Sequence, residues 1–228
     1  MTPKLVLFDL DGTLLNTIAD LREAVNHALK LRGLPQHSLE MITQMVGHGA
    51  RNLMIQALPE EHRDDGALID AMLADFRTYY NAHIEVYTKP FPGIPELLDE
   101  LHRNDIKLAV ASNKFQEGTE HLIREFFPSI PFVAVLGNRQ GFPLKPDPEV
   151  VGEVLRKAGV NKEDAVMVGD SDTDMETAAN GGIRGIAVCW GYRDMKDRTK
   201  LGIDPSESSG SEFFVAETVE ELQKLLFN

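Results

Sequence analysis

The stretch at residues 4–17 reads K-L-V-L-F-D-L-D-G-T-L-L-N-T, and it constrains the fold more than any other part of the chain. Its apolar run from Leu5 to Phe8 is typical of a strand buried on both faces of a parallel sheet. Two carboxylates, Asp9 and Asp11, follow where that strand ends, and side chains two residues apart can point into one cleft. In an open α/β sheet, ligands bind at this carboxyl edge. An acidic turn without function would look the same, so later segments must decide between the two interpretations.

The composition limits the classes of partner. The chain has 228 residues, with 36 acidic against 23 basic side chains and a formal net charge of −13. This charge disfavours nucleic acid and anionic membranes as partners, and an anionic substrate would need local positive charge such as a metal ion. No apolar run reaches the length of a membrane span, the first residues show no signal-peptide pattern, and the single Cys189 fits a reducing compartment. We therefore expect a cytoplasmic protein.

Residues 17–87 carry helical periodicity and no strand pattern. Apolar residues recur at helical spacing from Ile18 to Leu29, and Ser38 is placed to cap a second helix. The glycine-flanked turn G-H-G-A-R-N-L at 47–53 is predicted to open a third helix, and a fourth is predicted at 67–84. These residues are therefore predicted to form a helical cap inserted after the first strand.

Strand and helix patterns alternate in the rest of the chain. Further strands are predicted at 107–111, 132–136, 165–168, 185–188 and 213–215. With right-handed crossovers, this alternation predicts a doubly wound parallel sheet, a Rossmann-like α/β core formed by residues 1–16 and 88–228. The segment P-S-E-S-S-G-S at 205–211 is predicted to be a flexible loop.

The candidate site residues lie in loops that should meet at the carboxyl edge of this sheet. They are Asp9 and Asp11 after the first strand, Ser112 and Asn113 after the 107–111 strand, Lys145 before the helix near Pro148, and Asp170 and Asp174 after the 165–168 strand. Alone, Ser112 would be interpreted as a helix cap and Lys145 as a solvated loop lysine. Four loops that converge on one edge predict a site instead.

Four segments in this order, D-L-D-G-T-L, S-N-K, K-P-D-P and V-G-D-S-D-T-D, resemble the four motifs of the haloacid dehalogenase-like superfamily. They span residues 6–175, and the helical insert after the first motif resembles the superfamily's cap. Within the superfamily, G-H-G-A-R-N-L, D-M-E-T-A-A-N-G-G-I and W-G-Y-R are similar to segments of phosphoglycolate phosphatases. The W-G-Y-R segment is interpreted as structural.

The resemblance implies the chemistry of an aspartate-based phosphatase. Asp9 would attack phosphorus and form an aspartyl phosphate, and Asp11 would protonate the leaving alkoxide and later activate water. Mg²⁺ would be held by Asp9, the Asp11 backbone carbonyl and Asp170. Asp174 would hold metal-bound waters or orient Lys145.

The remaining roles concern the phosphoryl group. Ser112 and the Asn113 backbone amide would donate hydrogen bonds to its oxygens, and Lys145 would neutralise charge on phosphate and on Asp9. The expected partner is a small phosphate ester, bound by a monomer or a weak homo-oligomer.

Substrate choice is expected to come from the cap turn. Gly47 and Gly49 allow close approach of the backbone, and Arg51 could bind a substrate carboxylate bidentately. His48 could do the same or merely pack. A surface helix start with an exposed arginine explains these residues equally well.

Several alternatives stay open. A phosphosugar mutase of the β-phosphoglucomutase kind shares the four motifs, although such mutases usually carry a bulkier apolar residue in place of Thr13. A nucleotidase or pyrophosphatase is also compatible. The non-enzyme alternative, a phosphate-binding regulatory module, is disfavoured by the intact set Asp9, Asp11, Lys145 and Asp170. Asp11 favours phosphate esters over haloacids, because a departing halide needs no proton.

Overall fold

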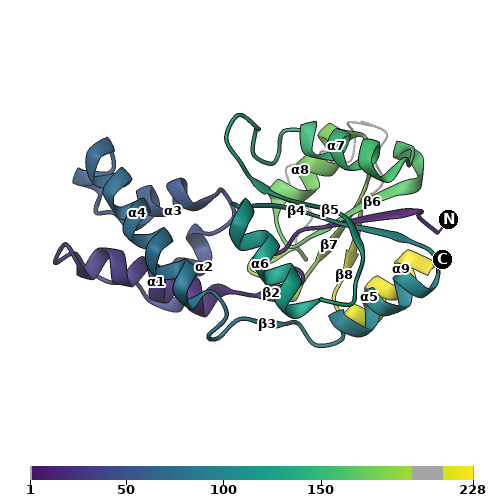
Figure 1. The fold of residues 1–228 in the computed structure, drawn as a ribbon, viewed down its shortest axis with the longest axis horizontal. Helices are drawn as coiled ribbons and strands as arrows, with labels where there is room; N and C mark the ends of the chain where they lie inside the picture. Colours follow the sequence, from purple (N-terminus) through teal and green to yellow (C-terminus); the bar gives the residue numbers. More distant parts are fainter. Residues whose placement is uncertain (1, 197–212, 228) are drawn as a thin grey trace.

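A six-stranded parallel sheet forms the centre of the computed structural model, which describes residues 2–196 and 213–227 (Figure 1). Its strand order is β5-β4-β1-β6-β7-β8. The strands are β1 (Leu5–Phe8), β4 (Lys107–Phe115), β5 (Phe132–Asn138), β6 (Ala165–Gly169), β7 (Arg184–Val188) and β8 (Phe213–Ala216). From β1 the sheet extends through β4 and β5 on one side and through β6, β7 and β8 on the other. This is the arrangement of a doubly wound sheet. The predicted fold class is confirmed.

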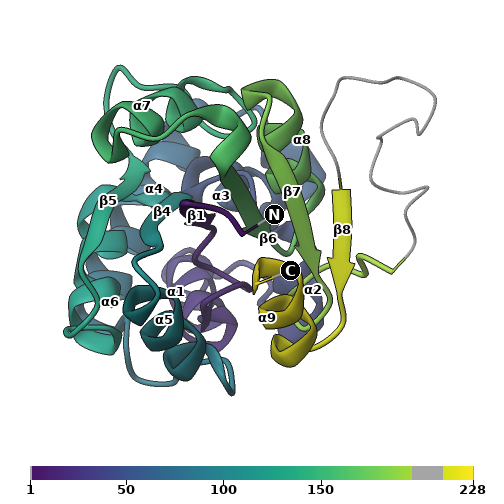
Figure 2. The same cartoon turned by 90° about the vertical axis from the view of Figure 1, so that its right-hand side faces the viewer.

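Helices cover both faces of the sheet (Figure 2). One face carries α7 (Glu149–Ala158) and α8 (Asp172–Gly181), and the other carries α5 (Ile94–Arg103), α6 (Gln116–Phe126) and α9 (Val219–Phe227). Side chains of a strand alternate between the two faces, so Leu5 and Leu7 pack in the cluster under α7 while Val6 and Phe8 pack in the cluster under α5 and α9. The centre of the sheet is therefore buried on both sides.

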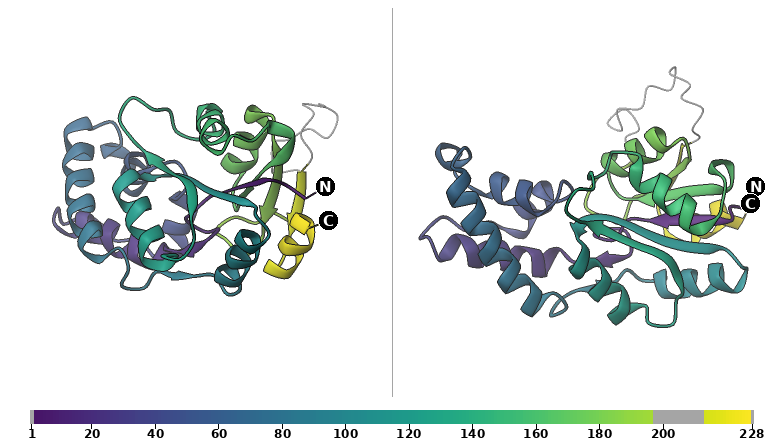
Figure 3. Two further views of the ribbon diagram at one scale, coloured as in Figure 1. Left: turned by 45° about the vertical axis from the view of Figure 1, so that its right-hand side comes forward. Right: turned by 45° about the horizontal axis from the view of Figure 1, so that its top comes forward.

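Helices α1 to α4 lie together beyond the carboxyl edge of the sheet (Figures 1 and 3). They are α1 (Ile18–Lys30), α2 (Leu39–Met45), α3 (Ala50–Ala57) and α4 (Gly66–His83), and we call residues 17–87 the cap. The predicted cap of α2 is observed, because the Ser38 side chain accepts a hydrogen bond from the Met41 backbone N–H. None of the helices in the described part of the chain has the length and apolar character needed to span a membrane.

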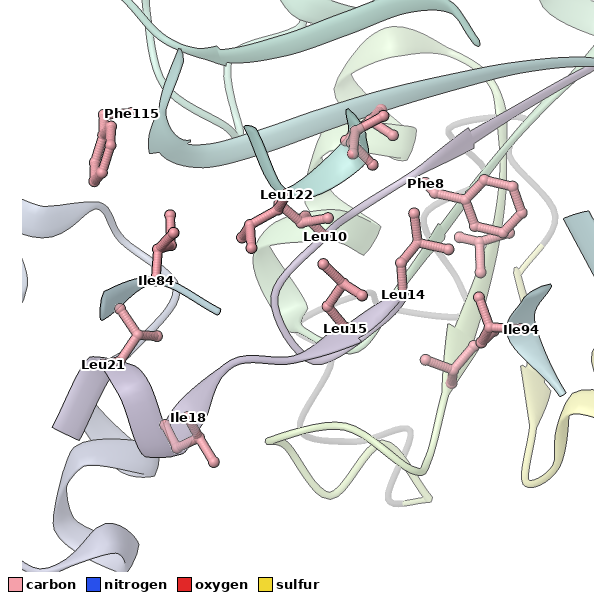
Figure 4. Packing of buried hydrophobic residues seen from close by; sticks show 14 of the residues in the cluster. Phe8, Leu10, Leu14, Leu15, Ile18, Leu21, Ile84, Ile94, Phe115 and Leu122 are labelled. Carbon is pink, nitrogen blue, oxygen red and sulfur yellow. The ribbon is translucent and has the colours of Figure 1, made fainter. Parts of the chain in front are cut away.

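The chain enters and leaves the cap through a small pair of strands that the sequence did not indicate. β2 (Leu15–Asn16) pairs antiparallel with β3 (Lys89–Pro90). Two residues are too few to show an alternating pattern. Next to this pair, a single apolar cluster runs from Phe8 to Ile18 and Leu21 of the cap (Figure 4). The cap is thus packed against the edge where the candidate site lies.

Strand β4 is longer than predicted. It continues past Ala111 to Phe115, so Ser112 and Asn113 lie within the strand and not after it. Its pairing with β5 shifts register between Ala111 and Phe115. The side chains between these residues therefore need not alternate regularly between the two faces of the sheet. The predicted loop at 205–211 lies outside the described residues.

Candidate active site

The site is built around Asp9, which follows the central strand β1. Its backbone N–H donates to the Val168 carbonyl at 2.9 Å, and the residue is 7% exposed. The ammonium of Lys145 lies 2.7 Å from Asp9 Oδ1 and 2.6 Å from Asp174 Oδ1, with its side chain 4% exposed. Residues from three separate segments of the chain therefore meet at one edge of the sheet.

Asp170 is fixed by two neighbouring segments. Thr13 Oγ1 donates to its Oδ1 at 3.3 Å, and the Tyr192 backbone N–H donates to its Oδ2 at 2.6 Å. Space for this carboxylate exists because two glycines flank it. A Cβ on Gly12, whose φ is +94°, or on Gly191 would lie 2.3 Å from an atom of the Asp170 side chain.

Burial and crowding shift the protonation of these carboxyl groups. Burial raises the pKa of Asp9 to about 7 in spite of the opposing effect of the Lys145 ammonium, and the charge of Asp174 adds to the rise. Burial, together with the charges of Asp9 and Asp174, also raises the pKa of Asp170 well above its usual value. Burial alone would lower the pKa of Lys145, but the two carboxylates raise it above its usual range. Lys145 is therefore a permanent cation.

Three buried carboxylates lie close together, and Lys145 contacts two of them, Asp9 and Asp174. Asp9, Asp170 and Asp174 each present an oxygen within 4.8 Å of the others, the arrangement expected for a metal site. Asp174 already uses its oxygens, because Oδ1 accepts from Lys145 and Oδ2 from the backbone and hydroxyl of Ser171. The cluster carries more negative charge than Lys145 offsets, so a bound divalent cation fits its chemistry. The predicted role of Asp174 in orienting Lys145 is consistent with these contacts.

Asp11 is held on the other side of the site. Thr17 Oγ1 donates to its Oδ1 at 2.7 Å, and the Lys114 ammonium lies 2.9 and 3.0 Å from its two carboxylate oxygens. The side chains of Lys114 and Asp11 are 3% and 13% exposed. Lys114 belongs to the S-N-K segment, but its position as a buried partner of Asp11 was not predicted.

The side chain of Asn113 ties the site together. Its Oδ1 accepts from the Lys145 backbone N–H at 2.9 Å, and its Nδ2 donates to the carbonyls of Lys145 and Gly47 at 3.1 and 3.0 Å. Ser112 Oγ accepts from the Lys114 backbone N–H at 3.2 Å. Both residues line the same cavity as Asp9 and Asp11.

That cavity lies between the sheet edge and the cap. Its volume is about 60 Å³, room for a few waters or a small molecule. The cap contributes Gly47, Gly49, Ala50 and Leu53 to its wall, together with Leu21, Phe76 and Tyr80.

The structure places Arg51 and His48 of the cap turn away from the cavity wall. Arg51 does not line the cavity; it is exposed and its guanidinium pairs with Asp70 of α4. His48 is exposed as well and lies outside the cavity wall. Arg51 is the second residue of α3, and at this position its side chain points towards α4. Gly47 and Gly49 of the same turn do line the cavity.

One cation that lines the cavity near the cap is Arg193, from the W-G-Y-R segment. Its guanidinium donates to the carbonyls of Thr43, Gln44 and Val46 at the end of α2, at 2.5, 3.1 and 2.6 Å. Unpaired carbonyls at a helix end need such donors. Arg193 thus joins the core to the cap, in agreement with the structural interpretation of its segment.

Comparison with known proteins places the chain among hydrolases. Residues 6–188 match the haloacid dehalogenase-like hydrolase family. A phosphoglycolate phosphatase from Mesorhizobium japonicum is 34% identical over 227 residues, covering 99% of this chain and 98% of that protein. One from Aquifex aeolicus is 33% identical over 189 residues, covering 83% and 86%.

A solved structure agrees with the sequence relatives. A crystal structure from Lactobacillus delbrueckii subsp. bulgaricus, whose phosphoglycolate phosphatase function is itself a prediction, matches with a TM-score of 0.87 and 31% identity over 99% of both chains. The family match, the relatives and the shared fold lead to the same conclusion: this chain belongs to the haloacid dehalogenase-like hydrolase family.

Proposed function

We propose that this chain is a Mg²⁺-dependent phosphatase that hydrolyses a small phosphomonoester of the 2-phosphoglycolate type through an aspartyl phosphate on Asp9. The observation that carries the proposal is the buried group of Asp9, Lys145, Asp170 and Asp174 at the end of β1. The relatives from Mesorhizobium japonicum and Aquifex aeolicus support the choice of substrate.

Asp9 is positioned as the nucleophile. Lys145 holds one of its oxygens at 2.7 Å, which fixes the carboxylate and leaves the other oxygen to attack phosphorus. The P–O bond to the alcohol breaks as the bond from Asp9 forms. Lys145 also offsets the negative charge of the incoming phosphate, and Ser112 with the Asn113 amide is placed to donate to the phosphoryl oxygens.

Asp11 serves both halves of the reaction. In the first it gives a proton to the leaving alkoxide, and in the second it takes a proton from the water that attacks the aspartyl phosphate. That water displaces Asp9 from phosphorus and releases inorganic phosphate. Thr17 and Lys114 hold the Asp11 carboxylate in place at the cavity wall.

Asp9, Asp170 and the backbone carbonyl of Asp11 would hold the metal ion. When bound, Mg²⁺ supplies positive charge that allows a phosphate dianion to approach two carboxylates. Asp174 is occupied with Lys145 and Ser171, so its contribution is to position these groups.

The test is release of inorganic phosphate by the purified protein. We would compare 2-phosphoglycolate with hexose phosphates, nucleotides and pyrophosphate, each with Mg²⁺ and with chelator. We expect metal-dependent hydrolysis that favours 2-phosphoglycolate. Isomerisation of a hexose phosphate without phosphate release would instead indicate a mutase. Full activity in chelator would contradict the proposed dependence on Mg²⁺.

The variant Asp9→Asn tests the covalent step. It preserves the shape of the side chain but removes the nucleophile, so turnover should fall by several orders of magnitude while the fold is retained. Acid quenching of wild type during turnover, followed by mass spectrometry, should locate phosphate on Asp9. Near-normal activity of Asp9→Asn would exclude the aspartyl phosphate.

A further inference from the structure

Three cationic side chains line the cavity in the described part of the chain, and each of them contacts other groups of the protein. Lys145 is shared by Asp9 and Asp174, and Arg193 is hydrogen-bonded to carbonyls of the cap. Lys114 holds the Asp11 carboxylate, and it differs from the other two in its position. Its ammonium contacts Asp11, the residue next to which the leaving oxygen must lie, and sits 4.8 Å from the centre of the Tyr80 ring.

Tyr80 adds a second polar group near Lys114, and its hydroxyl has no hydrogen-bond partner among the described residues. It comes from α4 of the cap, lines the cavity and is fully buried. Leaving a buried hydroxyl unpaired is unfavourable, so a polar atom of a bound molecule would be stabilised there. Burial, with a contribution from the Asp11 charge, raises the pKa of Tyr80 well above its usual value, which keeps the hydroxyl a neutral donor.

We propose that Lys114 and Tyr80 form the subsite for a carboxylate on the leaving alcohol, and that this subsite selects carboxylated phosphomonoesters. The inference rests on the proposed phosphatase function, because it assumes that the leaving oxygen lies beside Asp11. In 2-phosphoglycolate, a single methylene group separates that oxygen from the carboxylate. An ester oxygen beside Asp11 therefore brings the carboxylate to the lysine that already contacts Asp11.

The surroundings agree with this assignment. The remaining wall contributed by the cap consists mainly of apolar side chains such as Leu21, Leu53 and Phe76. In such surroundings, a contact between an ammonium and a carboxylate is stronger than it would be in water. Arg51, the cation that the sequence suggested for this task, pairs with Asp70 outside the cavity.

The experiment compares two esters that differ in the carboxylate alone. These are 2-phosphoglycolate and 2-hydroxyethyl phosphate, whose leaving alkoxides both need a proton from Asp11. For Lys114→Met, we expect kcat/KM to fall about ten- to a hundred-fold more on 2-phosphoglycolate than on 2-hydroxyethyl phosphate. Because Asp11 acts on both esters, any indirect damage to Asp11 cancels in this ratio.

Three further variants sharpen the comparison. Lys114→Arg keeps the charge and should retain part of the preference for 2-phosphoglycolate. Tyr80→Phe should lower kcat/KM on 2-phosphoglycolate about three- to ten-fold, with little effect on 2-hydroxyethyl phosphate. Lys4→Met removes an exposed lysine that pairs with Asp164 and should change neither ester. Thermal unfolding of each variant identifies any loss of fold.

The outcomes separate the subsite from the proposed function. If wild type hydrolyses both esters and Lys114→Met slows both equally, Lys114 only positions Asp11 and the subsite is disproved. If wild type shows no preference between the esters, the carboxylate is not recognised and the subsite is again disproved. If wild type hydrolyses neither ester with Mg²⁺, the phosphatase proposal itself fails.

Discussion

The side-chain amide of Asn113 joins the core to the cap, because its Nδ2 donates to the Gly47 carbonyl of the cap turn at 3.0 Å. The same side chain makes two hydrogen bonds to the backbone of Lys145, at 2.9 and 3.1 Å. One amide therefore aligns the lysine that contacts the nucleophile and the turn that closes the cavity. A motif residue expected to act through its backbone amide also acts through its side chain.

Asn113→Ala should disturb both connections. We expect kcat/KM to fall about ten- to a hundred-fold and the free energy of unfolding to drop by about 1–3 kcal/mol, because buried hydrogen-bond partners are left unpaired. Asn180→Ala is a suitable control, since Asn180 donates to the Pro146 carbonyl from an exposed position. Its effect on activity should be small. Enzyme kinetics and chemical denaturation measure the two quantities, and equal effects of the two variants would contradict the role of Asn113.

Asp11→Asn should distinguish esters by their leaving groups. The amide cannot donate the proton that a poor alkoxide leaving group requires, whereas an aryl oxide leaves without it. We expect a loss in kcat of more than about a hundred-fold on alkyl phosphates and a much smaller loss on an aryl phosphate. A series of esters graded by the acidity of the leaving alcohol would measure this dependence. Equal losses across the series would argue against proton donation by Asp11.

Metal binding should weaken in acid. With its pKa near 7 in the metal-free protein, Asp9 is mostly protonated below that pH, and an incoming cation must displace the proton. The apparent dissociation constant for Mg²⁺ should therefore rise about ten-fold for each unit that the pH falls below 7, or more steeply if Asp170 titrates too.

Isothermal titration calorimetry at about pH 6 and about pH 8 would measure this change, and protons should be released on binding at the lower pH. Asp170→Asn should weaken binding strongly. Asp172→Asn is the matched control, because Asp172 lies in the same segment but is exposed. An affinity that does not vary with pH would show that Asp9 is not a ligand.

Arg193→Met and Arg51→Met should behave differently. Arg193 donates to three carbonyls at the end of α2, so its loss should loosen the cap and lower kcat/KM about ten-fold on every ester. Arg51 is exposed and paired with Asp70, so its loss should change kcat/KM by less than about two-fold. A selective loss on 2-phosphoglycolate in Arg51→Met would restore the cap turn as the specificity element.

The residues that sequence reasoning located are those tied to strand ends. Asp9, Lys145 and Asp170 could be placed together because buried strands are easy to recognise and their carboxyl ends meet at one edge. The helical cap was equally visible, since Ile18 to Leu29 follow a helical period. These features depend on local pattern and on general rules of topology.

Other residues have positions and roles that depend on packing between distant segments, and the sequence did not predict these correctly. The partner of Arg51 is known only when α3 packs on α4, and the side chain of Lys114 points to Asp11 after an irregular stretch of β4. Tyr80 follows the helical period of α4, so the sequence indicates only an ordinary buried aromatic side chain. Its unpaired hydroxyl becomes apparent only when the whole surrounding shell is known.

The tight space around Asp170 has a consequence for mutagenesis of this chain. Gly12 and Gly191 offer no functional group, yet a single methyl at either position would overlap the carboxylate. Replacement by alanine adds atoms at these two positions, whereas it removes atoms almost everywhere else. An alanine scan would therefore score both glycines as essential, although the damage would arise from occupied volume and not from a lost contact. Sensitivity to substitution in these two loops reflects the limited space around Asp170 as much as the chemistry of the site.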